Sequence, residues 1–140
     1  MISFDIPGDP RGKGRPRFST RGGAVRTFTD DKTAAYENLV TLEAQRVMAG
    51  RAPFQEPVDV EVTATLRIPA SASKRRQAAM LLGSELPLKL PDLDNILKAV
   101  LDGCNQVVFA DDKQVVGLTA HKRFGSTPGV FVKITPIAGA

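Results

Sequence analysis

The 140-residue chain has little cysteine, histidine or aromatic side chain, and these shortages narrow the possible sites. One cysteine, Cys104, excludes an internal disulfide, and one histidine, His121, excludes a zinc site built on the usual Cys/His spacings. Tryptophan is absent and aromatic residues make up 6%, which disfavours the stacking platform of proteins that bind single-stranded nucleic acid. Any metal would therefore be a hard cation held by oxygen atoms.

Long apolar runs are also missing. No stretch approaches the roughly 20 apolar residues that a membrane span needs, and the N-terminus lacks the apolar core of a signal peptide. We therefore expect a soluble, cytoplasmic protein with no membrane partner. The length indicates a single domain, residues 1–140. The net charge of +4 favours a polyanionic partner.

Apolar periodicity predicts the α+β class. Alternation favours strands at residues 2–6 and 58–68, a short strand near 24–29, and two further strands near 113–124 and 129–137. Helical spacing and cap signals favour helices over residues 30–50, 71–83 and 93–102. The expected architecture is a mixed or antiparallel sheet of about four to five strands with about three helices.

The segment "PDLDNILKAVLD", residues 91–102, carries the densest signal. On a helix its apolar side chains fall in one arc, while Asp94, Lys98 and Asp102 form a stripe on the other side, and Gly103 is placed to end the helix. The acids have a purely structural explanation. Asp92 or Asp94 would cap the helix, Lys98 would pair with both acids of its stripe, and Asp111 and Asp112 would be turn residues.

The same acids also suit a metal site. Five of the chain's 15 acids lie within residues 92–112, although the chain as a whole is basic. Asp92 and Asp94 would repel each other unless a cation lies between them. An EF-hand is excluded, because Leu97 stands where the loop needs glycine. We expect Asp92, Asp94 and one or both of Asp111 and Asp112 to bind Mg²⁺, if the chain after residue 110 returns beside the helix start.

A basic segment, residues 11–27, precedes the first helix. It contains six basic residues and no acid: Arg11, Lys13, Arg15, Arg17, Arg21 and Arg26. The segment lacks the spacing of a phosphate-binding Walker loop. It is better explained as a mobile loop that contacts a nucleic-acid backbone by charge and becomes ordered on binding. A solvated loop or a localisation tract remains the alternative.

Taken together, "PDLDNILKAVLDG", "VFADDKQVV", "HKRFG" and the opening "IPGDPRGKGRPRF" resemble the RusA-like Holliday junction resolvases, phage- and prophage-associated endodeoxyribonucleases. The resemblance implies a homodimer that cuts four-way DNA junctions symmetrically with Mg²⁺, for which Mn²⁺ can substitute. It implies that Asp92, Asp94, Asp112 and Lys98 are catalytic, and that Asp111 is a neighbouring acid at the metal. The expected DNA contacts are Lys13, Arg15, Arg17, Asn95, Lys98 and Lys122.

Two functional hypotheses follow. The first is a Mg²⁺-dependent, structure-selective endonuclease that resolves Holliday junctions by paired nicks in recombination and repair. The alternative is a non-catalytic, basic nucleic-acid-binding protein whose acids are structural caps. A metal-dependent phosphatase for small substrates is a weaker third hypothesis, because it leaves the basic segment unexplained.

Overall fold

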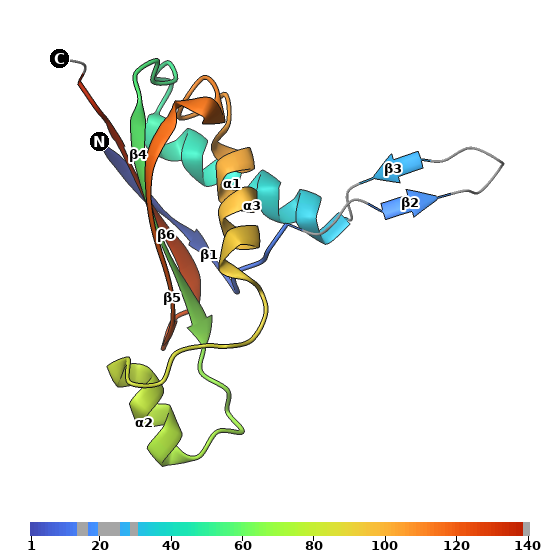
Figure 1. The fold of residues 1–140 in the computed structure, drawn as a ribbon, viewed down its shortest axis with the longest axis vertical. Helices are drawn as coiled ribbons and strands as arrows, with labels where there is room; N and C mark the ends of the chain where they lie inside the picture. The colour runs from blue at the N-terminus through green and yellow to red at the C-terminus, as the bar shows by residue number, and fades with distance from the viewer. Residues whose placement is uncertain (14–16, 20–25, 29–30, 139–140) are drawn as a thin grey trace.

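The fold is given by a computed structural model that describes residues 1–13, 17–19, 26–28 and 31–138, with the backbone alone for 17–19 and 26–28. Figure 1 shows its elements in space. In chain order they are β1 (Ile2–Pro7), β2 (Arg17–Ser19), β3 (Arg26–Phe28), α1 (Asp31–Met48), β4 (Val58–Arg67), α2 (Lys74–Leu82), α3 (Leu93–Cys104), the 3₁₀ turn η2 (Asp112–Gln114), β5 (Val115–Gly125) and β6 (Gly129–Pro136). The predicted α+β class and its three helices are confirmed.

A four-stranded mixed sheet forms the body, in the order β1-β6-β4-β5. β6 pairs antiparallel with β1 and β4, whereas β4 and β5 run parallel, which requires the crossover that carries α2 and α3. β2 and β3 form a separate antiparallel pair. The sequence did not predict β2, because three residues in a stretch rich in Gly, Pro and Arg give no alternation to detect.

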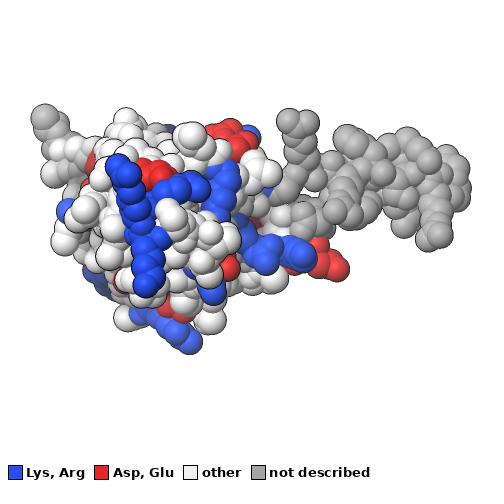
Figure 2. Space-filling model, turned by 90° about the horizontal axis from the view of Figure 1, so that it is seen from below, with Lys and Arg blue, Asp and Glu red and all other residues white. Residues whose placement is uncertain are grey.

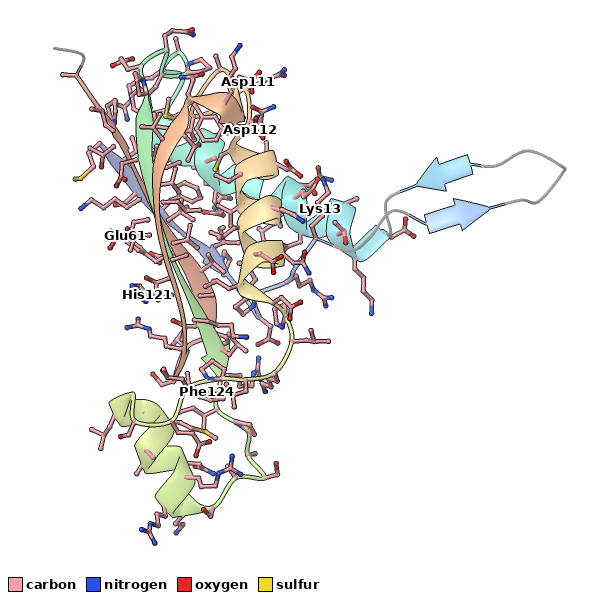
Figure 3. All side chains as sticks on the ribbon, viewed as in Figure 1. Lys13, Glu61, Asp111, Asp112, His121 and Phe124 are labelled. Carbon is pink, nitrogen blue, oxygen red and sulfur yellow. The ribbon has the colours of Figure 1, made fainter. Side chains whose placement is uncertain are left out.

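The core lies between one face of the sheet and helices α1 and α3. Strand β4 alternates between fully buried Val60 and Val62 and half-buried polar residues such as Glu61. Figure 3 shows Glu61 and His121 projecting from the sheet face opposite to α1 and α3. The side of the sheet that a β5 residue faces therefore decides whether it lies near α3.

The two covering helices meet closely at Gly103. A Cβ atom at this position would lie 2.5 Å from Cγ1 of Val40 on α1. The prediction that Gly103 follows the end of α3 is wrong, because the helix continues to Cys104 and is capped at Asn105. Glycine is needed there for the packing of two helices and not for a left-handed turn. Cys104 is fully buried beside Gly103.

In α1 the buried residues include Tyr36, Val40, Ala44 and Met48. Ala35, an apolar residue of the same helix, is exposed, whereas Ala44 is buried. The spacing explains the difference, because Tyr36, Val40, Ala44 and Met48 are each four residues apart and form one line along the helix.

Helix α2 lies at the end of the sheet remote from the C-terminus of α3 (Figure 1). Ser73 caps it by accepting from the Arg76 amide, and Gly83 ends it with φ +84°, as predicted. Exposed basic residues on and beside it include Arg67, Lys74, Arg75 and Arg76, and Figure 2 shows Lys and Arg side chains spread over this end of the molecule. Among the described residues, no helix is both long and apolar enough to cross a membrane.

Candidate active site

The N-terminal end of α3 presents two unpaired carboxylates. Asp92 is the N-cap residue, with φ −69° and ψ 143°, yet its side chain makes no capping hydrogen bond. Asp94 lies in the first helical turn. Both side chains are exposed, and neither forms an ion pair or hydrogen bond with any part of the chain that the structure describes. Capping, the simpler explanation of Asp92, is therefore not what its carboxylate does.

The C-terminal end of α3 holds the other acids in a bonded arrangement. Asp111 accepts from the Lys113 amide at 3.1 Å and forms a capping box with Gln114 around η2. The Lys113 amide lowers the pKa of Asp111. The hydrogen bond with Asp111 raises the pKa of Asp112, and the charges of Asp111 and Asp102 raise it further. Asp112 is therefore a neighbour of Asp102, near the last turn of the helix (Figure 3).

The predicted return of the chain to the helix start does not occur. Asp94 and Asp102 are eight residues apart on one helix, which at 1.5 Å per residue separates them by about 12 Å. Since Asp112 lies beside Asp102, one chain does not bring Asp112 to Asp92 and Asp94. Over residues 1–13 and 31–138, no three Asp, Glu, His or Cys side chains form a group that could hold a metal ion.

Lys98 lies between the two ends on the exposed face of α3. The purely structural explanation of the acids paired Lys98 with Asp94 and Asp102, but neither pair forms among the described residues. The ammonium group of Lys98 is thus available, one helical turn from Asp94.

Lys13, in contrast, is engaged inside the molecule. Its ammonium group donates to Asp102 and lies 3.4 Å from Oε1 of Glu37 on α1. The hydrogen bond to Asp102 raises the pKa of Lys13. Its backbone amide donates to the carbonyl oxygen of Asn95 at 2.9 Å. Lys13 therefore ties the chain that leads into β2 to both covering helices.

The remaining predicted DNA contacts divide into three cases. Lys122 is half-buried and donates to the carbonyl oxygens of Lys89 and Pro91 at 2.8 and 3.2 Å. Asn95 is half-buried beneath Gly12, where a Cβ atom would lie 2.8 Å from that of Asn95. Arg15 lies outside the described residues, and Arg17 is described only as part of the backbone of β2.

Comparison with known protein families identifies the family of the chain. The family described as Endodeoxyribonuclease RusA matches residues 7–135, almost the whole chain. The chain belongs to the RusA endodeoxyribonuclease family. The resemblance inferred from the sequence is confirmed, and the match covers both ends of α3, β5 and the basic segment before α1.

A curated relative supports a full-length correspondence. The chain is 31% identical over 144 residues to the uncharacterized protein YqaN of Bacillus subtilis (strain 168), covering 98% of this chain and 97% of that protein. The sequence correspondence with YqaN therefore extends over nearly the full length of both proteins.

The residues of this RusA family member fit a divalent metal at one end of α3. Asp92 and Asp94 offer exposed carboxylate oxygens that have no partner among the described residues, and carboxylate oxygens are donors that Mg²⁺ prefers. Asp111 and Asp112 offer the same kind of oxygen, but only at the opposite end of the helix. The fit is therefore to the first pair within one chain.

Sequence reasoning missed several residues that hold this region together. Gln114 donates to the carbonyl oxygens of Phe54 and Glu56 at 2.8 and 2.9 Å, which fixes η2 against the chain before β4. Glu37 and Asp102 receive Lys13. One feature of the sequence indicated these contacts, namely more acids than one helix cap needs. That excess does not indicate which acid binds which partner.

Proposed function

We propose that this RusA family member is a Mg²⁺-dependent, structure-selective endonuclease that cuts four-way DNA junctions by paired symmetric nicks in recombination and repair. It would act in the cytoplasm, as a homodimer, with Mn²⁺ as a substitute for Mg²⁺. The observation that supports this most is the pair of exposed, unpartnered carboxylates, Asp92 and Asp94, on a basic chain of a DNA endonuclease family.

Asp92 and Asp94 are the residues that would hold the metal. When bound, the metal would polarise the scissile phosphate and lower the pKa of the attacking water. Within the chain itself, Asp92 enters the helix and Asp94 occupies its first turn, so both carboxylates are carried by a regular element. A rigid support matters, because catalytic groups must be held close to the productive geometry.

Lys98 is proposed to act on the phosphate. It is exposed, free of an ion pair among the described residues, and one helical turn from Asp94. A cation there would stabilise charge that develops on the phosphate oxygens. Arg15 and Arg17, in the basic segment, are proposed to contact the DNA backbone and to supply affinity without sequence preference.

A homodimer would provide the acids that one chain does not bring together. Asp111 and Asp112 lie at the opposite end of α3 from Asp92 and Asp94. Two antiparallel copies of this helix, related by a two-fold axis, would place the first end of one chain beside the second end of the other. We propose that Asp111 and Asp112 serve the site of the partner subunit, and that the two sites match the symmetry of a four-way junction.

The test is cleavage of a labelled four-way junction with Mg²⁺ by the wild-type protein and by Asp92→Asn and Asp94→Asn. We expect symmetric nicks from the wild type and a loss of about 1,000-fold or more in each variant. Junction affinity should be kept or should rise, because each substitution removes a negative charge that faces the DNA. Glu85→Gln is a control, since it alters a half-buried acid on the connector after α2, paired there with Arg76, and should leave cutting unchanged.

The same experiment addresses the alternative. If the wild type binds junctions in a salt-sensitive manner but never cuts, with or without Mg²⁺ or Mn²⁺, the protein is a non-catalytic nucleic-acid-binding protein. If Asp94→Asn cuts as well as the wild type, the assignment of the metal pair is wrong.

A further inference from the structure

Lys122 faces the helices, unlike its neighbours on β5. In the parallel ladder it is paired with Ala64, which is buried beneath the helices, whereas His121 is paired with half-buried Thr63. His121 and Arg123 are exposed, and Lys122 is half-buried. Its long side chain therefore passes along the covered side of the sheet edge towards the chain that precedes α3.

The ammonium group of Lys122 joins two carbonyl oxygens of that chain. It donates to Lys89 at 2.8 Å and to Pro91 at 3.2 Å, and Asp92 is the next residue. No carboxylate among the described residues lies within ion-pair distance of it. A second β5 residue also contacts this stretch, because the ammonium group of Lys89 lies 5.8 Å from the ring centroid of Phe124.

The approach to α3 has few other supports. Residues between Gly83 and Leu93 form no helix or strand, and the side chain of Leu90 is 76% exposed. Leu90 and half-buried Pro91 border two hollows, of about 310 Å³ and about 330 Å³, and Pro87 is the buried residue of this stretch. The N-cap hydrogen bond that usually fixes a helix start is missing, since the Asp92 side chain makes none.

We propose that Lys122 is a positioning residue that holds residues 89–91 and thereby sets how Asp92 and Asp94 enter α3. Sequence reasoning assigned it to the DNA backbone, but its donors are directed at protein carbonyls. In the first turn of α3, the Lys13 amide donates to the Asn95 carbonyl oxygen. The start of α3 is thus held by hydrogen bonds from Lys122 and Lys13 to backbone carbonyl oxygens. The carboxylates of Asp92 and Asp94 take no part in them and stay available to a ligand.

The effect of Lys122 on cutting rests on the proposed function. Its role in holding residues 89–91 does not. The experiment therefore has three readouts besides cutting, applied to Lys122→Met and Lys122→Arg. The first is amide hydrogen exchange over residues 86–98, measured without metal or DNA. The second is the salt dependence of junction binding in Ca²⁺, and the third is a calorimetric titration of the protein with Mn²⁺ alone. Lys133→Met is the matched control, because Lys133 is also a half-buried lysine within a strand but lies opposite Ser3 and Glu61 on the uncovered face.

We expect Lys122→Met to speed exchange over residues 86–98 by about 10-fold or more, by loss of hydrogen bonds to a charged donor, and to weaken Mn²⁺ binding. Cutting should fall by at least about 10-fold through kcat, and the salt slope of DNA binding should stay unchanged. Lys122→Arg should restore much of each property, and Lys133→Met should match the wild type.

Two outcomes overturn the proposal. One is exchange over residues 86–98 that is the same in Lys122→Met and the wild type. The other is a salt slope lowered by about one with unchanged Mn²⁺ affinity, which identifies a direct phosphate contact. If exchange rises in Lys122→Met but the wild type neither binds Mn²⁺ nor cuts junctions, the support is real and the proposed function is wrong.

Discussion

The two ends of helix α3 carry the same kind of residue in opposite circumstances. At the N-terminal end, Asp92 and Asp94 are exposed and have no partner among the described residues. At the C-terminal end, Asp102 receives Lys13, and Asp111 caps η2. One helix thus presents free carboxylates at its start and engaged carboxylates at its end.

The difference shows how the fold is stabilised without engaging the carboxylates at the start of α3. Gly103 and Cys104 are buried against α1 at the C-terminal end, so this end anchors the helix in the core. The N-terminal end is held through backbone carbonyl oxygens, at Asn95 by the Lys13 amide and at Pro91 by Lys122. Bonds to the backbone fix the position of a residue and leave its side chain free.

The largest effect is expected from combining lesions at the two ends. Asp94→Asn and Asp112→Asn should each abolish cutting as pure proteins. If each site takes Asp94 from one subunit and Asp112 from the other, a mixed dimer has one intact site, and random mixing should restore about a quarter of the wild-type nicking rate. The measurement is the nicking of a labelled junction after the two proteins are unfolded and refolded together.

The control for this mixture puts both lesions at the same end. A mixture of Asp92→Asn and Asp94→Asn has no intact site in any arrangement and should stay inactive. Absence of recovery in the Asp94→Asn and Asp112→Asn mixture would mean that each chain uses only its own acids. Full activity of Asp112→Asn alone would remove Asp112 from the site.

The next largest effect should be on the free energy of unfolding, which a glycine substitution should lower more at the C-terminal end of α3 than at its start. Gly103→Ala places a Cβ atom 2.5 Å from Cγ1 of Val40 and 3.1 Å from the Glu37 carbonyl oxygen. We expect a loss of about 1–3 kcal/mol in the free energy of unfolding, because helices packed in a core have little room to separate. Gly12→Ala, whose Cβ atom would lie 2.8 Å from that of Asn95, should cost less, since its segment lies at the surface and can shift.

Urea denaturation of both variants checks this prediction. The double variant Val40→Ala, Gly103→Ala is the informative partner, because removing the Val40 methyl groups makes room for the new one. If the double variant loses as much free energy of unfolding as the two single variants together, or more, the contact with Val40 is not the cause.

Much of the fold follows from patterns in the sequence, and the site follows only in part. The alternation of Val58 to Leu66 and the caps of α2 are local signals, and the structure has both where they were expected. Gly103 was misjudged, because a glycine near a helix end has the same local signature whether it ends the helix or admits a neighbouring helix. Only the packing of α1 distinguishes the two cases.

The position of Asp112 was beyond sequence reasoning for a similar reason. Residues 105–111 join Cys104 to η2, and when extended they could span about 23 Å, enough to return to the helix start. Instead the connector folds tightly, with the Gln106 amide donating to the Phe109 carbonyl oxygen at 2.8 Å. Gln114 then fixes η2 to the chain before β4. These are contacts between distant residues, which spacing does not predict.

A smaller effect should distinguish Lys98 from Lys13, both of which were expected from the sequence to contact DNA. Lys98 is free among the described residues, so Lys98→Met should lower the salt slope of junction binding by about one. Lys13 is bound to Asp102 and Glu37, so Lys13→Met should leave the slope nearly unchanged. Binding isotherms at several salt concentrations measure both. Equal reductions would show that DNA draws Lys13 away from its two acids.

The last comparison of the two ends is the reaction rate of a thiol placed at each. Cys104 is fully buried, and burial raises the pKa of its thiol from 9.0 to about 12. Ellman's reagent at pH 8 should therefore modify the folded protein only through unfolding, at least about 1,000-fold more slowly than the denatured chain. Cys104→Ala, Asp94→Cys, which moves the thiol to the exposed helix start, should react about as fast as a free thiol.

The raised pKa of Cys104 also sets the sign of a pH effect. The folded protein retains the thiol proton more strongly than the unfolded chain, so this contribution to stability is full below pH 9 and is lost as pH rises towards 12. Burial raises the pKa of Tyr36 from 10.0 to about 12 in the same direction. The free energy of unfolding of Cys104→Ala should therefore fall less than that of the wild type between pH 8 and pH 10. The difference in slope should be no more than one titrating group contributes. Parallel curves for the two proteins would mean that the thiol ionises as readily in the fold as outside it.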